Sequence, residues 1–176
     1  MRRYLAIVAA CLCCASAASA MDIPTRKAGQ WEIKMQFMDG KLPARAMRQC
    51  IDQATDKMMN SSIGGDAGSH CSKREIKNVG GTMVVDSVCQ FGAGTTTSHA
   101  VVSGSFDSAY EVDVTSTRKG GPPIPGMAPN HTTHMKITAK WLGPCPAGTR
   151  AGDIMMGNGM KMNILDLQKM RGVPPR

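Results

Sequence analysis

One stretch decides the fold of this chain: CSKREIKNVGGTMVVDSVCQFGAGTTTSHAVVSGSFDSAYEVDVTSTRK, which runs from Cys71 to Lys119. Its last part shows the pattern most plainly, because the apolar residues Tyr110, Val112 and Val114 alternate with polar ones. Side chains in a β-strand point to opposite faces in turn, so these three share one face. The other face carries Glu111, Asp113, Thr115 and Thr117. One apolar and one solvated face is typical of an antiparallel sheet.

Turn signals divide the stretch into four strands. Gly80-Gly81 supplies the positive φ values of a tight hairpin turn, and two further short connections lie at 92–94 and 107–108. The strands are rich in Thr, Val and Ser, which suit a half-buried pleated surface. The predicted strands are Cys71–Val79, Thr82–Phe91, Thr95–Phe106 and Tyr110–Lys119.

The same alternation extends to both sides of this meander. Before it, we expect a strand that opens at Gly29 and ends near Phe37, with Trp31, Ile33 and Met35 facing inward, and a second strand over Ala44–Cys50. After it, the proline-rich segment 120–129 predicts a protruding loop, because proline cannot donate to a strand ladder. A last strand follows over His131–Trp141.

Two short helices complete the expected elements. Either Asp52 or Thr55 caps the first, which runs through Met59 with Met58 and Met59 on the sheet, before a polar loop from residue 60 to residue 69. The second covers Asn163–Arg171, where apolar residues recur at helical spacing. We therefore predict a mainly β (α+β) domain over residues 21–176: a curved antiparallel meander of about seven strands, a half-barrel with a concavity, and a flexible tail from Val173.

The first 20 residues are typical of an export signal. Two arginines precede the apolar run Tyr4–Cys14, which is too short to span a bilayer as a helix. Ala18–Ala20 forms a small-residue cleavage site, so we expect a mature periplasmic or secreted chain that begins at Met21. An alternative is lipid anchoring through Cys11, which follows Val8-Ala9-Ala10. No later segment is long and apolar enough for a membrane helix, so we expect no transmembrane span.

Four cysteines remain once the signal is removed, and an even number in an exported chain predicts two disulfides. Four cysteines allow three pairings. Cys71 and Cys89 lie nearly opposite each other across the Gly80-Gly81 turn, which favours Cys71–Cys89 and leaves Cys50–Cys145. The mature chain keeps 19 basic and 13 acidic residues, a net charge of +6.

Several of these features together resemble a known family. They are Gly29-Gln30-Trp31-Glu32-Ile33, Arg48-Gln49-Cys50-Ile51-Asp52, Cys71-Ser72-Lys73, Val88-Cys89 and Trp141-Leu142-Gly143-Pro144-Cys145. The chain resembles the bacterial exported proteins grouped as domain-of-unknown-function family 3617, over nearly all of its mature length. The resemblance implies an exported, disulfide-bonded, mostly β domain and carries no catalytic residue.

Methionine is unusually frequent and raises the alternative of a copper protein. Thioether and imidazole groups bind Cu(I) where cysteines are already paired, and the candidates are Met160 and Met162 with His131 and His134. A strand would place the two histidines on opposite faces, because they are three residues apart. The competing interpretation is that methionine fills gaps in the core.

Enzyme motifs are absent from the sequence, which has no G-x-S-x-G elbow, no HExxH and no glycine-rich phosphate loop. We therefore expect a non-enzymatic, monomeric protein without a cofactor and without nucleic acid as a partner. Basic residues lie on or beside the strands, and a basic face would meet anionic envelope components. They are Lys34, Lys73, Arg74, Lys77, Arg118, Lys119, Lys136 and Lys140. The leading hypothesis is a binding or envelope-associated protein for an unknown apolar or anionic small molecule.

Overall fold

A computed structural model describes residues 23–40, 43–64, 70–122 and 130–170. These residues form strands and two helices in the following order: β1 (Gly29–Phe37), β2 (Arg45–Ile51), α1 (Gln53–Gly64), β3 (Cys71–Val79), β4 (Thr82–Phe91), β5 (Gly94–Ser105), β6 (Ala109–Gly120), β7 (Thr132–Gly143), β8 (Asp153–Met156), β9 (Lys161–Asn163) and α2 (Ile164–Met170). The predicted signal at 1–20, with Cys11, and the tail from Val173 lie outside the described residues.

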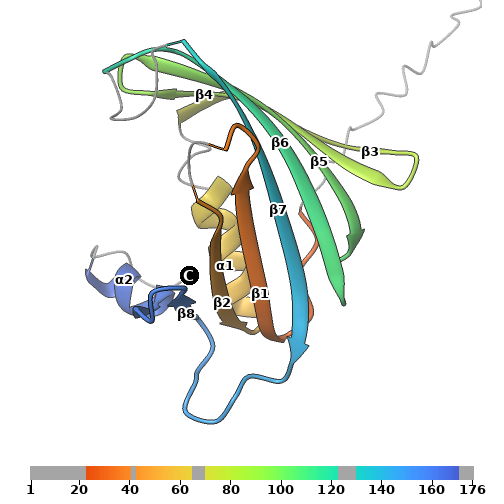
Figure 1. The fold of residues 1–176 in the computed structure, drawn as a ribbon, viewed down its shortest axis with the longest axis vertical. Coiled ribbons are helices and arrows are strands. Elements are labelled where there is room, and N and C mark those ends of the chain that lie inside the picture. Colours follow the sequence, from red (N-terminus) through yellow and green to blue (C-terminus); the bar gives the residue numbers. More distant parts are fainter. Residues whose placement is uncertain (1–22, 41–42, 65–69, 123–129, 171–176) are drawn as a thin grey trace, which may run out of the picture.

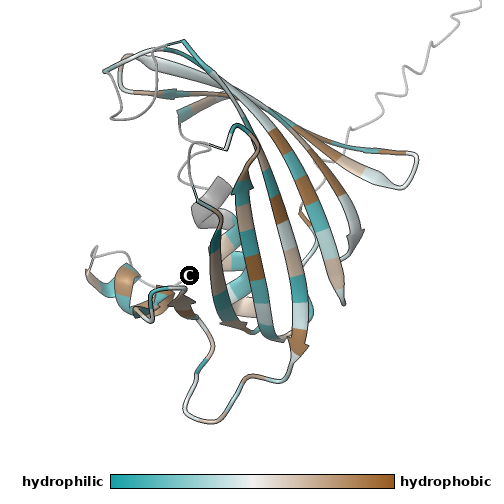
Figure 2. Ribbon diagram, in the orientation of Figure 1, coloured by the Kyte–Doolittle hydropathy of each residue, from teal (hydrophilic) through white to brown (hydrophobic). Residues whose placement is uncertain are grey.

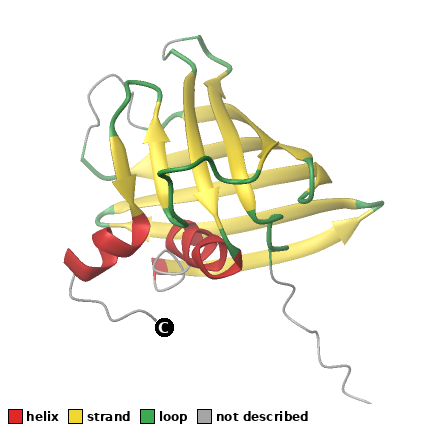
Figure 3. Ribbon diagram, turned by 90° about the horizontal axis from the view of Figure 1, so that it is seen from below, coloured by secondary structure: helices red, strands yellow, loops and turns green. Residues whose placement is uncertain are grey.

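The strands make one antiparallel sheet in the order β3-β4-β5-β6-β7-β1-β2-β8-β9. The sheet curves strongly but stays open, with β3 and β9 as its two edges (Figures 1 and 3). Strand β7 pairs with β1, and α1 connects β2 to the distant edge strand β3. Helix α1, within this connection, lies on the concave side of the sheet (Figure 3). The predicted curved meander and the two short helices are confirmed.

Two details of the prediction are wrong. The described residues contain nine strands rather than about seven, because the short strands β8 and β9 form a hairpin after Cys145. Neither is long enough to show a clear alternation of apolar and polar residues. Helix α1 also continues past Met59 to Gly64, so the expected polar loop from residue 60 begins too early.

The alternating pattern accounts for the longer strands. Figure 2 shows hydrophilic and hydrophobic residues alternating along β1 and β7. Between β3 and β4, Gly80 and Gly81 have φ of 60° and 81°, the two positive values that a tight primed hairpin turn requires. The predicted turn is therefore confirmed, and it fixes the register in which Ile76 faces Val85.

The core lies between α1 and the strands beside it. Trp31, Ile33, Ile51, Met59 and Ala139 form its buried cluster, and Trp31 is completely buried. Gly29, two residues before Trp31, allows β1 to approach β7, because a Cβ there would lie 2.4 Å from the carbonyl oxygen of Gly143. The Gly-x-Trp opening of β1 is thus explained by packing.

Both expected disulfides are present, Cys71–Cys89 and Cys50–Cys145. The first joins the directly paired strands β3 and β4, and the second joins β2 to the segment that follows β7. Two disulfides are typical of a protein that folds in an oxidising compartment. Neither α1 nor α2, the helices of the described part, has the length and apolar content of a membrane-crossing helix.

Candidate functional site

The site follows from the faces of the sheet. We call the face that carries Trp31 and Ile33 the inner face, because Met59 of α1 packs there, and the opposite one the outer face. Residues directly paired in an antiparallel sheet have side chains on the same face. The register therefore assigns each strand residue to one face, from β3 across to β2.

Two cross-strand rows make the inner face of β3–β7 apolar. The first row is Met83, Val102, Val112, Ile137 and Met35, and on β3 it ends at the polar Asn78. The second row is Ile76, Val85, Ala100, Val114, Met135 and Phe37. We call these two rows the apolar band. Val102 is buried, whereas Val85, Val112 and Val114 are only half-buried. At its β1 and β7 end the band meets the core, because Met35 and Ile137 pack against the buried cluster. Across β3–β6 the band extends away from α1, which among the described elements packs chiefly on β2 and α2.

Polar residues continue the inner face beyond the band. The next row consists of Arg74, Ser87, Ser98, Ser116 and Thr133, and we call it the hydroxyl row. The hydroxyl oxygens of Ser98 and Ser116 are 2.7 Å apart and hydrogen-bonded. One step further, Thr96 pairs with Arg118.

A recess of about 330 Å³ lies at this polar end of the inner face. Its lining residues are Phe91, Gly94, Thr96, Ser116, Arg118, His131 and Thr133. The Arg118 backbone N–H donates to the His131 carbonyl oxygen at 3.0 Å, and one guanidinium nitrogen donates to the Pro122 carbonyl oxygen at 3.0 Å. These two bonds hold Arg118 at the recess, which we call the Arg118 recess.

The two faces of the sheet differ in the charged side chains that they carry. Every carboxylate of strands β1–β7 lies on the outer face: Glu32, Glu75, Asp86, Glu111 and Asp113. The six lysines of these strands also lie there: Lys34, Lys73, Lys77, Lys119, Lys136 and Lys140. The Lys, Arg, Asp and Glu side chains on the inner face of the same strands are three arginines: Arg45, Arg74 and Arg118. The basic residues are therefore divided between the faces: the six lysines lie on the outer face with Arg48, which pairs with Glu32, and the inner face carries Arg45, Arg74 and Arg118.

Ion pairs neutralise most of the outer carboxylates. Lys77 lies 2.9 Å from Glu75, and this hydrogen bond, with one from Lys73, lowers the pKa of the Glu75 carboxyl. His99 Nδ1 lies 2.7 Å from Asp86 Oδ1 and lowers the pKa of that carboxyl. A hollow of about 480 Å³ on this face is lined partly by Glu32, Lys34 and Glu111, which already pair with lysine or glutamate neighbours. The inner face offers the better site.

A buried ion pair holds α1 against the sheet. Arg26 Nε and Asp56 Oδ1 are 2.7 Å apart, Arg26 is 7% exposed and Asp56 is fully buried. The Arg26 backbone N–H donates to the other carboxylate oxygen at 2.7 Å, and its guanidinium also donates to Gln49 of β2 at 2.9 Å. Burial raises the pKa of the Tyr110 phenol, and the positive charge of Arg26 opposes that shift. The pair thus joins the N-terminal arm, α1 and β2.

The cap of α1 is reciprocal. The Thr55 backbone N–H donates to Asp52 Oδ1 at 2.8 Å, and the Asp52 N–H donates to Thr55 Oγ1 at 3.0 Å. Hydrogen bonds from the Thr55 backbone and side chain lower the pKa of the Asp52 carboxyl. Asp52 is therefore the N-cap, and Thr55 is its partner in the first turn.

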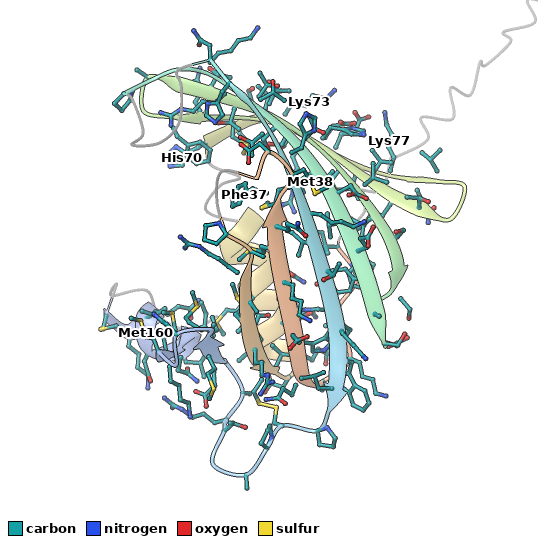
Figure 4. All side chains as sticks on the ribbon, viewed as in Figure 1. Phe37, Met38, His70, Lys73, Lys77 and Met160 are labelled. Carbon is teal, nitrogen blue, oxygen red and sulfur yellow. A yellow bond between two sulfur atoms is a disulfide. The ribbon has the colours of Figure 1, made fainter. Side chains whose placement is uncertain are left out.

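The four candidate copper ligands do not come together. The register places His134 on the outer face, where it contacts Thr115 at 3.1 Å, while His131 lines the Arg118 recess on the inner side. Met160 precedes β9 and is 56% exposed, and Met162 lies on β9, four strands away from β7 in the sheet. Figure 4 shows Met160 near α2, far from the β3 end marked by His70. Among the described residues, no cluster of His, Cys, Asp or Glu is suited to a metal ion.

Sequence reasoning missed two features of the site. It assigned Tyr110, Val112 and Val114 to one face, and the same period continued to Ser116 and Arg118 predicts their common side. It also treated residues 21–28 as a short arm, although Arg26 in this arm is buried against Asp56. No local pattern signals that pair, since its members are 30 positions apart in the sequence.

These features define a class: an open antiparallel half-barrel with two disulfides, one helix in its concavity and an amphipathic inner face. The protein-family comparison agrees with the resemblance seen in the sequence. Residues 26–145 match the family described as a protein of unknown function, DUF3617, and the chain belongs to that family. Searches of curated proteins and of solved structures found no match.

Proposed function

We propose that this protein is a periplasmic binding protein, exported by its N-terminal signal and without enzymatic activity, which holds an apolar ligand or envelope component on its inner face. The observation that carries the proposal is the half-buried apolar band on β3–β7, on the part of the sheet beside the core that α1 covers. A contiguous apolar band that stays partly open to solvent is typical of a surface that binds an apolar partner. Paired cysteines and the signal sequence support export.

The test compares neighbouring valines on the two faces of β4. Val85 lies in the apolar band, whereas Val84 pairs with Val101 on the outer face. Valine to threonine keeps the shape of the side chain and adds a hydroxyl group. We expect saturable binding of the neutral fluorophore N-phenyl-1-naphthylamine by the mature protein, weakened by Val85→Thr and unchanged by Val84→Thr. Absence of saturable binding, or equal effects of the two substitutions, rejects the proposal.

Copper binding stays a prediction, confined to Met160 and Met162 because His131 and His134 lie elsewhere. Titration of the mature protein with Cu(I) under a competing chelator tests it. If the two methionines bind copper, replacing both with leucine weakens the uptake. An unchanged affinity after this replacement removes them as ligands.

A further inference from the structure

The inner face has a polarity gradient that runs in one direction. Along β6 it passes from Val112 and Val114 in the apolar band, through Ser116 in the hydroxyl row, to Arg118 in the recess. A strand rises by about 3.4 Å per residue, so Val112 and Arg118 lie about 20 Å apart along it. The neighbouring strand β5 repeats the order, with Val102, Ala100, Ser98 and Thr96. A gradient shared by adjacent strands matches one elongated ligand with an apolar end and a polar end.

The polar end of the gradient carries positive charge, because the strand carboxylates lie on the other face of the sheet. Arg118 lies on an inner face whose described strand residues from β1 to β7 include no carboxylate. The local potential at Arg118 is therefore positive. Hydroxyl groups of Thr96, Ser116 and Thr133 line the same recess as additional hydrogen-bond donors. Such a recess suits an anion.

An arginine is better suited than a lysine to bind an anionic headgroup in the recess. Its planar guanidinium forms paired, charge-assisted hydrogen bonds to carboxylate or phosphate oxygens. Only one of its N–H groups is used by the Pro122 carbonyl oxygen in the structure. The lysines of the same strands lie on the outer face, where ion pairs with Glu32, Glu75 and Glu111 hold four of them. Lys119, directly after Arg118, is exposed on that outer face and provides a matched control.

We propose that the ligand is a single-chain amphiphile with an anionic headgroup, its chain on the apolar band and its headgroup in the Arg118 recess. This inference deepens the function proposed above and rests on it. The shared chemistry is an acyl or alkyl chain that ends in a carboxylate or phosphate. The hydroxyl row lies where the chain meets the headgroup, so its serines and threonine donate to the polar atoms of that junction.

The experiment compares two amphiphiles with the same chain, dodecyl phosphate and neutral dodecyl maltoside, each below its critical micelle concentration. Titration calorimetry on the mature, disulfide-bonded protein measures both affinities. We expect the phosphate to bind about tenfold or more tightly than the maltoside, as a hydrogen-bonded charge provides. Arg118→Gln lowers the affinity for the phosphate about tenfold or more and so removes that preference. Arg118→Lys keeps the charge without the paired geometry and gives an intermediate affinity.

Lys119→Gln is the matched control, because it removes the same charge one residue away on the outer face. It should leave both affinities unchanged at moderate salt. An equal loss in Lys119→Gln and Arg118→Gln would show a general effect of net charge and would overturn the inference. Thermal unfolding of both variants verifies that each is folded before its affinity is compared.

The remaining outcomes separate the inference from the function on which it rests. If both amphiphiles bind equally, the ligand need not be anionic and only this inference fails. If neither binds, the proposed function fails as well. Inorganic phosphate that binds as tightly as dodecyl phosphate identifies a free-anion site, and binding to phosphatidylglycerol vesicles alone identifies a membrane surface. Either result overturns the single-chain ligand.

Discussion

The two halves of the sheet have the same strand pattern but different surroundings. In β1, β2 and β7, the residues Trp31, Ile33, Ile51 and Ala139 form the buried cluster with Met59 of α1, and Trp31 is completely buried. In β3–β6, the inner side chains Val85, Val112 and Val114 remain half-buried. The first half therefore provides most of the buried apolar area that stabilises the fold, and the second keeps a surface available for a ligand. Alternation alone does not distinguish a core from a binding face.

The disulfides give the largest expected difference between the halves. Cys50–Cys145 closes a separation of 95 residues beside the covered half, and Cys71–Cys89 closes one of 18 in the open half. In the chain-entropy picture, loops of about 100 and about 15 residues contribute about 4.7 and about 3 kcal/mol. Urea unfolding of the two double-alanine variants should therefore show the greater loss for Cys50→Ala with Cys145→Ala. The reverse order would contradict the comparison.

The next effect comes from the ion pair that holds α1. Asp56→Ala leaves Arg26 buried without its carboxylate, and we expect the free energy of unfolding to fall by about 4 kcal/mol. The combined variant Arg26→Met with Asp56→Leu should recover much of that loss, because no buried charge remains. Chemical denaturation measures both. Glu32→Ala, which removes a partly exposed pair with Lys34 on the outer face, is the control and should cost about 1 kcal/mol or less.

A smaller effect separates the inner side chains of the two halves. Ile33 is 7% exposed beneath α1, so Ile33→Ala should cost about 3 kcal/mol, including the cavity it creates. Val85 is half-buried in the open half, so Val85→Ala should cost about 1 kcal/mol. Equilibrium unfolding of the two variants compares them. Equal costs would mean that the apolar band is packed as tightly as the core.

The smallest predicted effect is the pH dependence of the β8–β9 hairpin, which extends the covered half. Burial would raise the pKa of Asp153, but hydrogen bonds from Lys161, the Arg150 backbone and Asn163 outweigh it and lower the pKa to about 2. Because this lies below the unfolded value of about 3.9, the carboxylate stabilises the fold above that pH and loses its effect as pH falls towards 2. We expect a contribution on the order of 1 kcal/mol.

Thermal unfolding of the wild type and Asp153→Asn at pH 5 and pH 2.5 measures this contribution. The two proteins should differ in unfolding temperature at pH 5, and the difference should narrow at pH 2.5. At the lower pH the carboxyl of the unfolded chain is mostly protonated, so folding must release its proton. A difference that stays constant would assign the effect to packing of Asp153 rather than to its charge.

Local chemistry made much of the fold predictable. The period of two in the strands, the Gly80-Gly81 turn and the opposition of Cys71 and Cys89 depend on residues close together in the sequence. Two short strands escaped prediction because contacts with distant parts of the chain hold them in place. Strands β8 and β9 are held by the Asp153 network and by a hydrogen bond from Gly152 N–H to the Cys50 carbonyl oxygen, a contact between distant segments.

The sequence by itself therefore determined which residues share a face within each strand, because side-chain direction follows from backbone geometry. Only the tertiary structure decided which of those faces is covered. The pairing of β7 with β1 and the burial of Arg26 against Asp56 bring together residues that are far apart in the chain. These long-range contacts place α1 over one half of the sheet and leave the other half with its apolar band and the Arg118 recess.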